Sequence, residues 1–377
     1  MRGISKTITK LNAVRAMQVQ ATPRRGVGRL SRLTGFGSNP GALDAKIYVP
    51  ADLLPGAALV VVLHGCTQDA EGYDHGAGWS QLADKMGFAL LYPEQLRSNN
   101  FNLCFNWYET GDVTRGRGEV LSIRQMIETM IDTHALDRRR VFVTGLSAGG
   151  AMTSAMLACY PDVFAGGAII AGLPYACATS VPEAFGQMHR ASTIGGDPTA
   201  TVRAAFAHDG PWPTLSVWHG DADRIVDPSN AAAIIEQWRG LHGVEATPSR
   251  SEIINGHMHQ SWQDASGRPV IEFYSIAGVG HGVPLATRGD ETCGTAGAHM
   301  LDADISSTHH IARSWELDSA GPRMTRHPAR HAGQAAPLPT ANIDETASIA
   351  AAPAGLSLSY DPGCVINNAL RAAGLMK

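Results

Sequence analysis

Several signatures of other protein classes are missing from this chain of 377 residues. No apolar run approaches the roughly 20 residues that a membrane-spanning helix requires, so we expect no membrane span. Neither C-x-x-C nor H-E-x-x-H spacing occurs, and no glycine-rich fingerprint for a dinucleotide or triphosphate is present, so we expect neither a metal nor another cofactor. The net charge of only −4 also disfavours a dedicated nucleic-acid binder.

Acidic side chains are missing from residues 1–32, which hold two lysines and six arginines. The same segment lacks the apolar core of a secretory signal, so the default localisation is cytoplasmic. We expect residues 1–34 to form a basic arm. Its role stays open between a loosely packed extension, an electrostatic contact with an anionic partner and a cleavable targeting segment.

Large apolar side chains are scarce between residues 319 and 354, where Ala, Pro, Gly, Thr and His predominate. Such a segment buries too little surface to offset its ordering entropy, so we expect a low-complexity linker. Residues 355–377 regain helical apolar spacing from Val365 to Met376, which predicts a C-terminal helical segment. We expect that helix to dock on the body of the chain, with binding to a partner as the alternative.

Residues 35–318 alternate between strand-like and helix-like segments. This alternation predicts one α/β domain, with a mostly parallel sheet covered by helices on both faces. Pro50 ends the first strand and places that strand at a sheet edge. The expected strands are 45–50, 59–63, 88–92, 141–144, 164–170, 214–218 and 270–276, and the expected helices are 119–133, 151–158 and 230–238.

A serine stands between a strand and a helix in the sequence Gly145-Leu146-Ser147-Ala148-Gly149. The G-x-S-x-G motif in this context is typical of a nucleophile elbow, in which a tight turn exposes a serine hydroxyl above a helix N-terminus. Glycine is expected on both sides because bulkier side chains would clash in the turn. We therefore expect Ser147 to be a nucleophile.

An acid and a histidine follow this serine in the order that such a triad requires, each after a strand. The strand at 270–276 leads to His281, the expected general base. The strand at 214–218 leads to Asp221 and Asp223, which point to opposite sides of an extended chain, so position alone favours neither. The pattern H-G-x-x-D-x-x-V of related hydrolases selects Asp223, with Asp221 as a capping or turn residue.

The apolar strand at 59–63 ends in the segment His64-Gly65-Cys66-Thr67-Gln68. In hydrolases with a nucleophile elbow, the loop after this strand supplies one backbone N–H to an oxyanion hole, and the residue after the nucleophile supplies the other. We expect these donors to be the N–H groups of Cys66 and Ala148. The alternative for His64-Gly65 is a plain strand-to-loop turn.

Separated motifs occur in a fixed order along the chain: Leu63-His64-Gly65-Cys66-Thr67-Gln68, Tyr92-Pro93-Glu94-Gln95, Cys104-Phe105-Asn106-Trp107-Tyr108, Arg117-Gly118-Glu119, the serine motif, and Cys293-Gly294-Thr295-Ala296-Gly297. Together they resemble the poly(3-hydroxybutyrate) depolymerase family of esterases, which includes feruloyl and acetylxylan esterases. The resemblance covers about residues 35–317. It implies the α/β-hydrolase fold and a serine carboxylic-ester hydrolase that works through an acyl-enzyme.

The same resemblance implies hydroxyalkanoate oligomers or related short esters as substrates. Feruloyl, aryl or acetylxylan esters are the alternative, and an acyltransferase or a non-catalytic binding protein on this scaffold is less favoured. The sequence gives no oligomeric state. Extracellular or periplasmic members of the family stand against the cytoplasmic default, so the localisation stays open.

Aromatic side chains after strand ends are expected to line the substrate site, on the side of the sheet that carries the elbow. The resemblance implies an aromatic residue near the acyl group at the position of Trp107. Tyr108, Trp79 and Tyr175 are further candidates, and Gln68 is expected to contact substrate as well. Core packing is the alternative for each tryptophan.

The six cysteines leave two pairings open. Cys66 and Cys104 lie in motifs of the resemblance, and a disulfide between them would brace the oxyanion loop in an oxidising compartment. The alternative is two free, buried thiols that pack as small apolar groups. A Cys293–Cys364 pair would hold the tail on the body in the same kind of compartment, and the other two cysteines are expected to be unpaired.

Deleting everything after Leu317 should lower the free energy of unfolding by a few kcal/mol, because a fully buried large aliphatic side chain contributes about 1.5–3 kcal/mol. Activity per folded molecule should change little, since no expected triad or oxyanion residue lies in the deleted part. Thermal and urea unfolding of the full-length and truncated chains measure this. Equal stabilities would show that the terminal helix does not dock.

Overall fold

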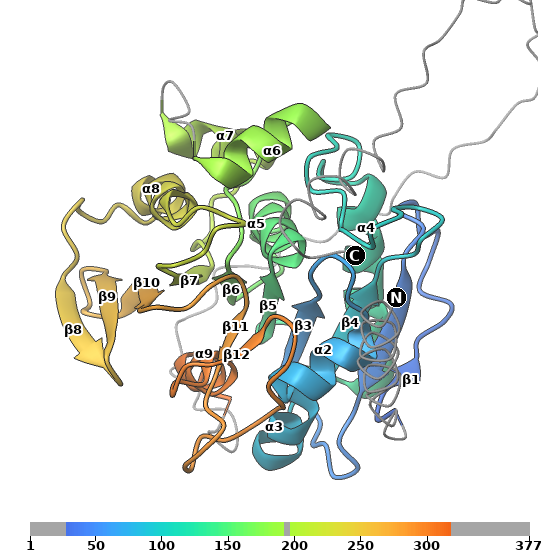
Figure 1. The fold of residues 1–377 in the computed structure, drawn as a ribbon. Helices are drawn as coiled ribbons and strands as arrows, with labels where there is room; N and C mark the ends of the chain where they lie inside the picture. The colour runs from blue at the N-terminus through green and yellow to red at the C-terminus, as the bar shows by residue number, and fades with distance from the viewer. Residues whose placement is uncertain (1–27, 192–196, 318–377) are drawn as a thin grey trace, which may run out of the picture.

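The computed structural model describes residues 28–191 and 197–317, which form a large twisted sheet with helices packed around it (Figure 1). The sheet has ten strands in the order β1-β2-β4-β3-β5-β6-β7-β10-β9-β8, and β11 and β12 form a separate pair. The strands are β1 (Ser31–Arg32), β2 (Asp44–Tyr48), β3 (Leu59–Leu63), β4 (Ala89–Glu94), β5 (Val141–Leu146), β6 (Gly166–Ile170), β7 (Thr214–Gly220), β8 (Arg250–Ile254), β9 (His257–Gln263), β10 (Pro269–Ile276), β11 (Val283–Leu285) and β12 (Met300–Asp302).

The central strands from β4 to β10 run parallel, and the strands beyond them on both sides are antiparallel. This arrangement confirms the predicted mostly parallel sheet. The prediction that the first strand lies at an edge is wrong, because β2 pairs with both β4 and the two-residue strand β1. Pro50 lies past the end of β2 and therefore removes no hydrogen bond from the sheet.

Helices cover both faces of the sheet, as Figure 1 shows. They are α2 (Ala70–Ala77), α3 (Trp79–Met86), α4 (Gly118–His134), α5 (Ala148–Cys159), α6 (Val181–His189), α7 (Pro198–Ala205), α8 (Ser229–His242) and α9 (Ser307–Ser314). No helix of the described residues is long and apolar enough to cross a membrane.

The central strand β3 explains how two cores form. Its side chains alternate between the faces of the sheet, and every one of its residues is buried. Leu59, Val61 and Leu63 belong to the core under α4, α5 and α8, whereas Val60 and Val62 belong to the core that includes α2, α3 and α9. Burial on both faces accounts for the continuous apolar run.

The predicted basic arm differs from the structure at its end. Residues Ser31–Arg32 form β1, and the Arg29 side chain donates hydrogen bonds to the Ser80 hydroxyl at 2.8 Å and the Tyr48 hydroxyl at 2.7 Å, and also pairs with Asp84. Residues 28–34 therefore belong to the folded body. The rest of the arm, the linker at 319–354 and the helical segment at 355–377 lie outside the described residues.

Candidate active site

The turn between β5 and α5 holds Ser147 in an unusual backbone conformation of positive φ, with φ 57° and ψ −117°. Such a conformation is strained for a residue with a side chain and persists only where the surrounding structure enforces it. The N–H of Ser147 donates to the carbonyl of Ile170 at 2.9 Å, and its own carbonyl accepts from Ala151 at 2.9 Å. The turn is thereby tied to β6 on one side and to α5 on the other.

The glycines around Ser147 allow α5 to pass close to the end of β3. A side chain on Gly149 would place its Cβ 2.2 Å from the carbonyl oxygen of Leu63, and one on Gly145 would place its Cβ 2.4 Å from the carbonyl oxygen of Gly149. Neither glycine has a positive φ. The glycines are needed because backbone meets backbone here, whereas the strained dihedral angle belongs to the serine itself.

His281 and Asp223 are brought together from the loops after β10 and β7. The Nδ1 atom of His281 lies 2.7 Å from Oδ2 of Asp223. Because a carboxylate only accepts hydrogen bonds, Nδ1 carries the proton and Nε2 is left as an acceptor. Ser147 and His281 line the same pocket.

The Asp223 carboxylate is buried and fully engaged. Its Oδ1 accepts from the N–H groups of Ile225 at 2.8 Å and Val226 at 3.0 Å, and His219 Nε2 lies 3.4 Å from Oδ2. Burial by itself would raise the pKa of Asp223, but hydrogen bonds from His219 and His281 hold that pKa well below its ordinary value. The carboxylate therefore stays ionised and can stabilise a protonated His281.

Asp221 has a different role from Asp223, although the two residues are close in sequence. Its side chain is exposed, and Oδ1 accepts a hydrogen bond from the N–H of Gly278 at 2.7 Å. This contact fixes the turn that leads from β10 to His281. The geometry thus brings Asp223 to the histidine and leaves Asp221 in the turn.

The oxyanion loop after β3 is oriented by a buried histidine. The Nε2 atom of His64 accepts from the N–H of Gln95 at 3.1 Å, so Nδ1 carries the proton that it donates to the Gly65 carbonyl at 2.8 Å. Burial lowers the pKa of His64 and keeps the ring neutral. Since the two polar groups of a trans peptide point in opposite directions, the N–H of Cys66 points away from His64.

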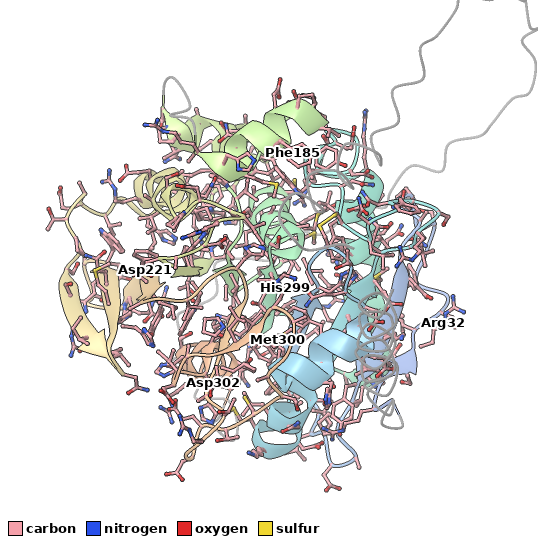
Figure 2. The ribbon with its side chains drawn as sticks, viewed as in Figure 1. Arg32, Phe185, Asp221, His299, Met300 and Asp302 are labelled. Atoms are coloured by element: carbon pink, nitrogen blue, oxygen red, sulfur yellow. A yellow bond between two sulfur atoms is a disulfide. The ribbon has the colours of Figure 1, made fainter. Side chains whose placement is uncertain are left out.

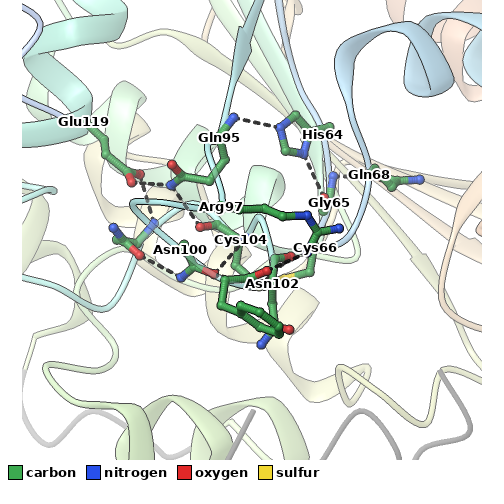
Figure 3. Close-up of a disulfide and its surroundings, with 12 residues drawn as sticks. His64, Gly65, Cys66, Gln68, Gln95, Arg97, Asn100, Asn102, Cys104 and Glu119 are labelled. Carbon is green, nitrogen blue, oxygen red and sulfur yellow. Dashed lines mark hydrogen bonds between the residues drawn. A yellow bond between two sulfur atoms is a disulfide. The ribbon is translucent and has the colours of Figure 1, made fainter. Parts of the chain in front are cut away.

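Two further contacts hold the same loop. The N–H of Gly65 donates to Oε1 of Gln68 at 2.8 Å, and the N–H of Thr67 donates to the carbonyl of Asn102 at 2.7 Å. Cys66 forms a disulfide with Cys104, so of the two open alternatives the structure has the paired one (Figure 3). Cys364 lies outside the described residues, and its pairing with Cys293 stays a prediction.

A buried carboxyl group stabilises the segment that carries Cys104. Glu119 accepts from Nε2 of Gln95 at 2.6 Å and from the N–H of Asn106 at 2.9 Å, and the same Gln95 amide donates to the Cys104 carbonyl at 3.0 Å (Figure 3). Burial and, to a smaller extent, the charge of Asp112 raise the pKa of Glu119 to about 8. Glu119 thus connects the start of α4 to the loop that carries Cys104.

The pocket at Ser147 contains several residues that sequence reasoning missed. Its wall includes Met188 from α6, Ile225 after β7, Thr67 from the oxyanion loop and His299 before β12. Ile225 lies inside the motif that selected Asp223, which is a weak signal for its position. Nothing in the sequence around Met188 or His299 indicates a pocket.

Only one of the predicted substrate-binding residues lines the pocket at Ser147. Gln68 lines the pocket, but its side-chain oxygen is occupied by Gly65. Trp107 and Tyr108 belong to a buried apolar cluster with Ala148, against which Cys66, Met188 and Ile225 also pack. They form the support behind the pocket wall.

Two other aromatic candidates lie elsewhere. The hydroxyl of Tyr175 donates to the carbonyl of Val113 at 3.2 Å, and its ring packs against the core under α4, α5 and α8. Trp79 begins α3, is fully buried and stacks on Trp315, so its expected place in the substrate wall is wrong and the packing alternative holds. Among the described residues, no three His, Cys, Asp or Glu side chains gather as a metal ion would require.

A comparison with protein families identifies the chain. The family described as Esterase PHB depolymerase matches residues 43–256, more than half of the chain. The chain belongs to this family. The match contains Ser147 and Asp223 and ends before His281, whose place in the site comes from the strand order and from its contact with Asp223.

Relatives and a solved structure agree with this membership. Poly(3-hydroxyalkanoate) depolymerase C of Paucimonas lemoignei is 44% identical over 302 residues, which are 78% of this chain and 72% of that protein. Feruloyl esterase B of Talaromyces funiculosus is 34% identical over 68% of this chain and 73% of its own. The acetyl xylan esterase structure from Aspergillus awamori has a TM-score of 0.62 at 27% identity and covers 67% of this chain and 94% of that one. The chain is an α/β-hydrolase and a carboxylic ester hydrolase.

Replacing Glu119 with Gln should destabilise the protein more at pH 5 than at pH 8. The folded protein keeps the Glu119 proton up to a pKa of about 8, whereas the unfolded chain loses it near the ordinary value of 4.5. Wild-type stability therefore falls by about 1.4 kcal/mol per pH unit between these values, and the variant lacks this loss. Urea unfolding at both pH values measures the difference.

The control is Glu109→Gln, which changes an exposed carboxylate in the same segment of chain. Its effect on the free energy of unfolding should be small, because an exposed substitution usually changes stability by less than about 0.5 kcal/mol. An equal cost of Glu119→Gln at both pH values would mean that Glu119 is ionised throughout this range.

Proposed function

We propose that the protein hydrolyses short aliphatic esters through an acyl-enzyme on Ser147, with His281 as general base and Asp223 as its orienting acid. The observation that carries the proposal is the 2.7 Å contact of His281 Nδ1 with the buried Asp223 carboxylate, in a pocket that Ser147 also lines. This contact fixes the histidine tautomer in which Nε2 accepts a proton from serine.

The chemistry proceeds in two halves. The Ser147 hydroxyl attacks the ester carbonyl while His281 Nε2 takes its proton, and the carbonyl oxygen becomes an oxyanion. The N–H groups of Cys66 and Ala148 stabilise that oxyanion; the first is directed by His64, and the second is an N-terminal N–H of α5 that has no intrahelical acceptor.

Collapse of the oxyanion breaks the ester C–O bond, and His281 gives its proton to the leaving alcohol. Water then enters the same position and attacks the acyl-enzyme while His281 removes one of its protons. Collapse of this second oxyanion breaks the bond to Ser147, releases the carboxylic acid, and lets His281 return the proton to the serine oxygen. Each step uses side chains and backbone N–H groups of this chain together with water, so the proposal requires no cofactor.

We propose hydroxyalkanoate oligomers or related short esters as the substrate class. Leu146, Met188 and Ile225 give the pocket an apolar wall that suits a short aliphatic acyl group. The hydroxyalkanoate depolymerase relative is 44% identical, against 34% for feruloyl esterase B. Feruloyl and acetylxylan esters remain the second candidate, because relatives named for them match over two thirds of the chain.

Asp223→Asn should lower kcat by about 10⁴-fold, the loss seen when a triad imidazole takes the wrong tautomer. Asp221→Asn is the matched control, because its amide oxygen can still accept from Gly278, and it should lose little activity. Hydrolysis of p-nitrophenyl butyrate measures both, with Ser147→Ala as the inactive reference. Full activity of Ser147→Ala would exclude the serine mechanism, and a reversed order of the two aspartates would exclude Asp223 as the acid.

Parallel assays on a hydroxybutyrate trimer, methyl ferulate and an acetylated xylo-oligosaccharide test the substrate class. We expect kcat/KM for the trimer to exceed that for methyl ferulate by at least about tenfold. Each substrate group that fits an apolar pocket poorly raises the activation free energy by about 1–3 kcal/mol. Ile225→Ala should reduce the preference for the trimer, because the smaller side chain enlarges the pocket and removes part of its apolar wall. A higher kcat/KM for methyl ferulate or for the acetylated xylo-oligosaccharide than for the trimer would reject the hydroxyalkanoate assignment.

A further inference from the structure

A second histidine lies directly beside His281. The short strands β11 and β12 run parallel with Val283 opposite Met300, and His281 and His299 lie just before them. Figure 2 shows His299 near the middle of the molecule, with Met300 and Asp302 following it in the chain. The centroids of the two rings are 5.9 Å apart, and the ring planes meet edge to face at 81°.

His299 holds the main chain of the His281 segment at two points. Its Nδ1 atom lies 3.1 Å from the carbonyl oxygen of His281, and its own carbonyl accepts from the N–H of Val283 at 2.8 Å. Because a carbonyl oxygen only accepts, Nδ1 of His299 carries the proton in the first contact. The second contact keeps the following strand in register.

The backbone at His299 has a positive φ. Its φ is 60°, in the left-handed region that is uncommon for residues other than Gly, although Asn, Asp and His adopt it more often than the rest. The neighbouring Gly282 has no room for a side chain, since a Cβ there would lie 2.8 Å from the His299 carbonyl oxygen. The close approach that requires Gly282 is the one that brings His299 onto the His281 segment.

The segment on the other side of His281 is fixed by different residues. The N–H of Gly278 donates to Asp221, and the N–H of Ala222 donates to the carbonyl of Val279 at 3.1 Å. His281 is therefore held from its N-terminal side by the loop after β7 and from its C-terminal side by His299. Asp223 holds the ring itself.

We propose that His299 is a positioning residue for His281: its Nδ1–H, bonded to the His281 carbonyl, fixes the distance of the His281 ring from Ser147. The inference rests on the proposed function, in which His281 is the general base. A base that is displaced by about 1 Å from its reacting partner costs about 10²-fold in rate. Loss of the Nδ1 contact should therefore lower kcat and leave ground-state binding nearly unchanged.

The test compares two substitutions that both accept the left-handed backbone. His299→Gly removes the side chain without adding backbone strain and should lower kcat about tenfold to a hundredfold; because His299 also lines the pocket, its effect on KM is read against His299→Asn, which keeps a side chain there. His299→Asn places an amide N–H near the position of Nδ1 and should recover most of the lost kcat. Hydrolysis of p-nitrophenyl butyrate and the rate of labelling of Ser147 by a neutral phosphonate measure the effect.

Asn255 offers a matched control. It has a φ of 50° and is exposed, and its amide donates to the carbonyl of Asp304 at 3.1 Å, so it makes the same kind of contact away from the pocket. Asn255→Gly should leave kcat, KM and the labelling rate unchanged. Thermal unfolding of every variant identifies a general loss of structure.

His299→Gln tests whether the other ring nitrogen matters instead, because its amide reaches about as far as Nε2. The inference is supported if Asn recovers kcat and Gln does not. It is overturned if His299→Gly keeps the wild-type kcat, if Asn is as slow as Gly, or if Gln recovers activity that Asn does not. Activity of Ser147→Ala or His281→Ala would instead reject the proposed function, so the two failures are distinguishable.

Discussion

The contact between α5 and the end of β3 is the constraint on which the site depends. Gly149 brings the two backbones so close that no Cβ fits between them. The helix can begin there only if the chain turns sharply after β5, and Ser147 takes up that turn in its strained conformation. The same contact places the first N–H groups of α5 beside the loop after β3, so the proposed nucleophile and the proposed oxyanion donors are positioned by one contact.

The parts of the molecule that follow from local pattern were predictable. The burial of β3 on both faces produced its apolar run, and the 3.6-residue spacing in α4 reflects a helix with one buried side. The order of Ser147, Asp223 and His281 along the chain follows from the order of the strands that carry them. The α/β-hydrolase fold and the family were therefore predictable, because short segments of the sequence encode the features that define them.

The parts that depend on distant segments were not predictable. Trp79 follows a strand and a helix in the way a pocket residue would, but α3 turns it into the core against Trp315. Met188 and His299 reach the pocket because α6 and β12 pack there, and no local pattern records that packing. Arg29 looked like part of a free basic arm because its partners are far along the chain; Asp84 is one of them.

The site is divided along the sheet in a way that matters for protein engineering. Cys66 and Ser147 follow β3 and β5, whereas Asp223 and His281 follow β7 and β10, with β6 between the two groups. A chain divided between β6 and β7 would give one fragment with the proposed nucleophile and another with the proposed acid and base. Neither fragment has a complete Ser–His pair, so ester hydrolysis would report their association, as in a split-enzyme reporter.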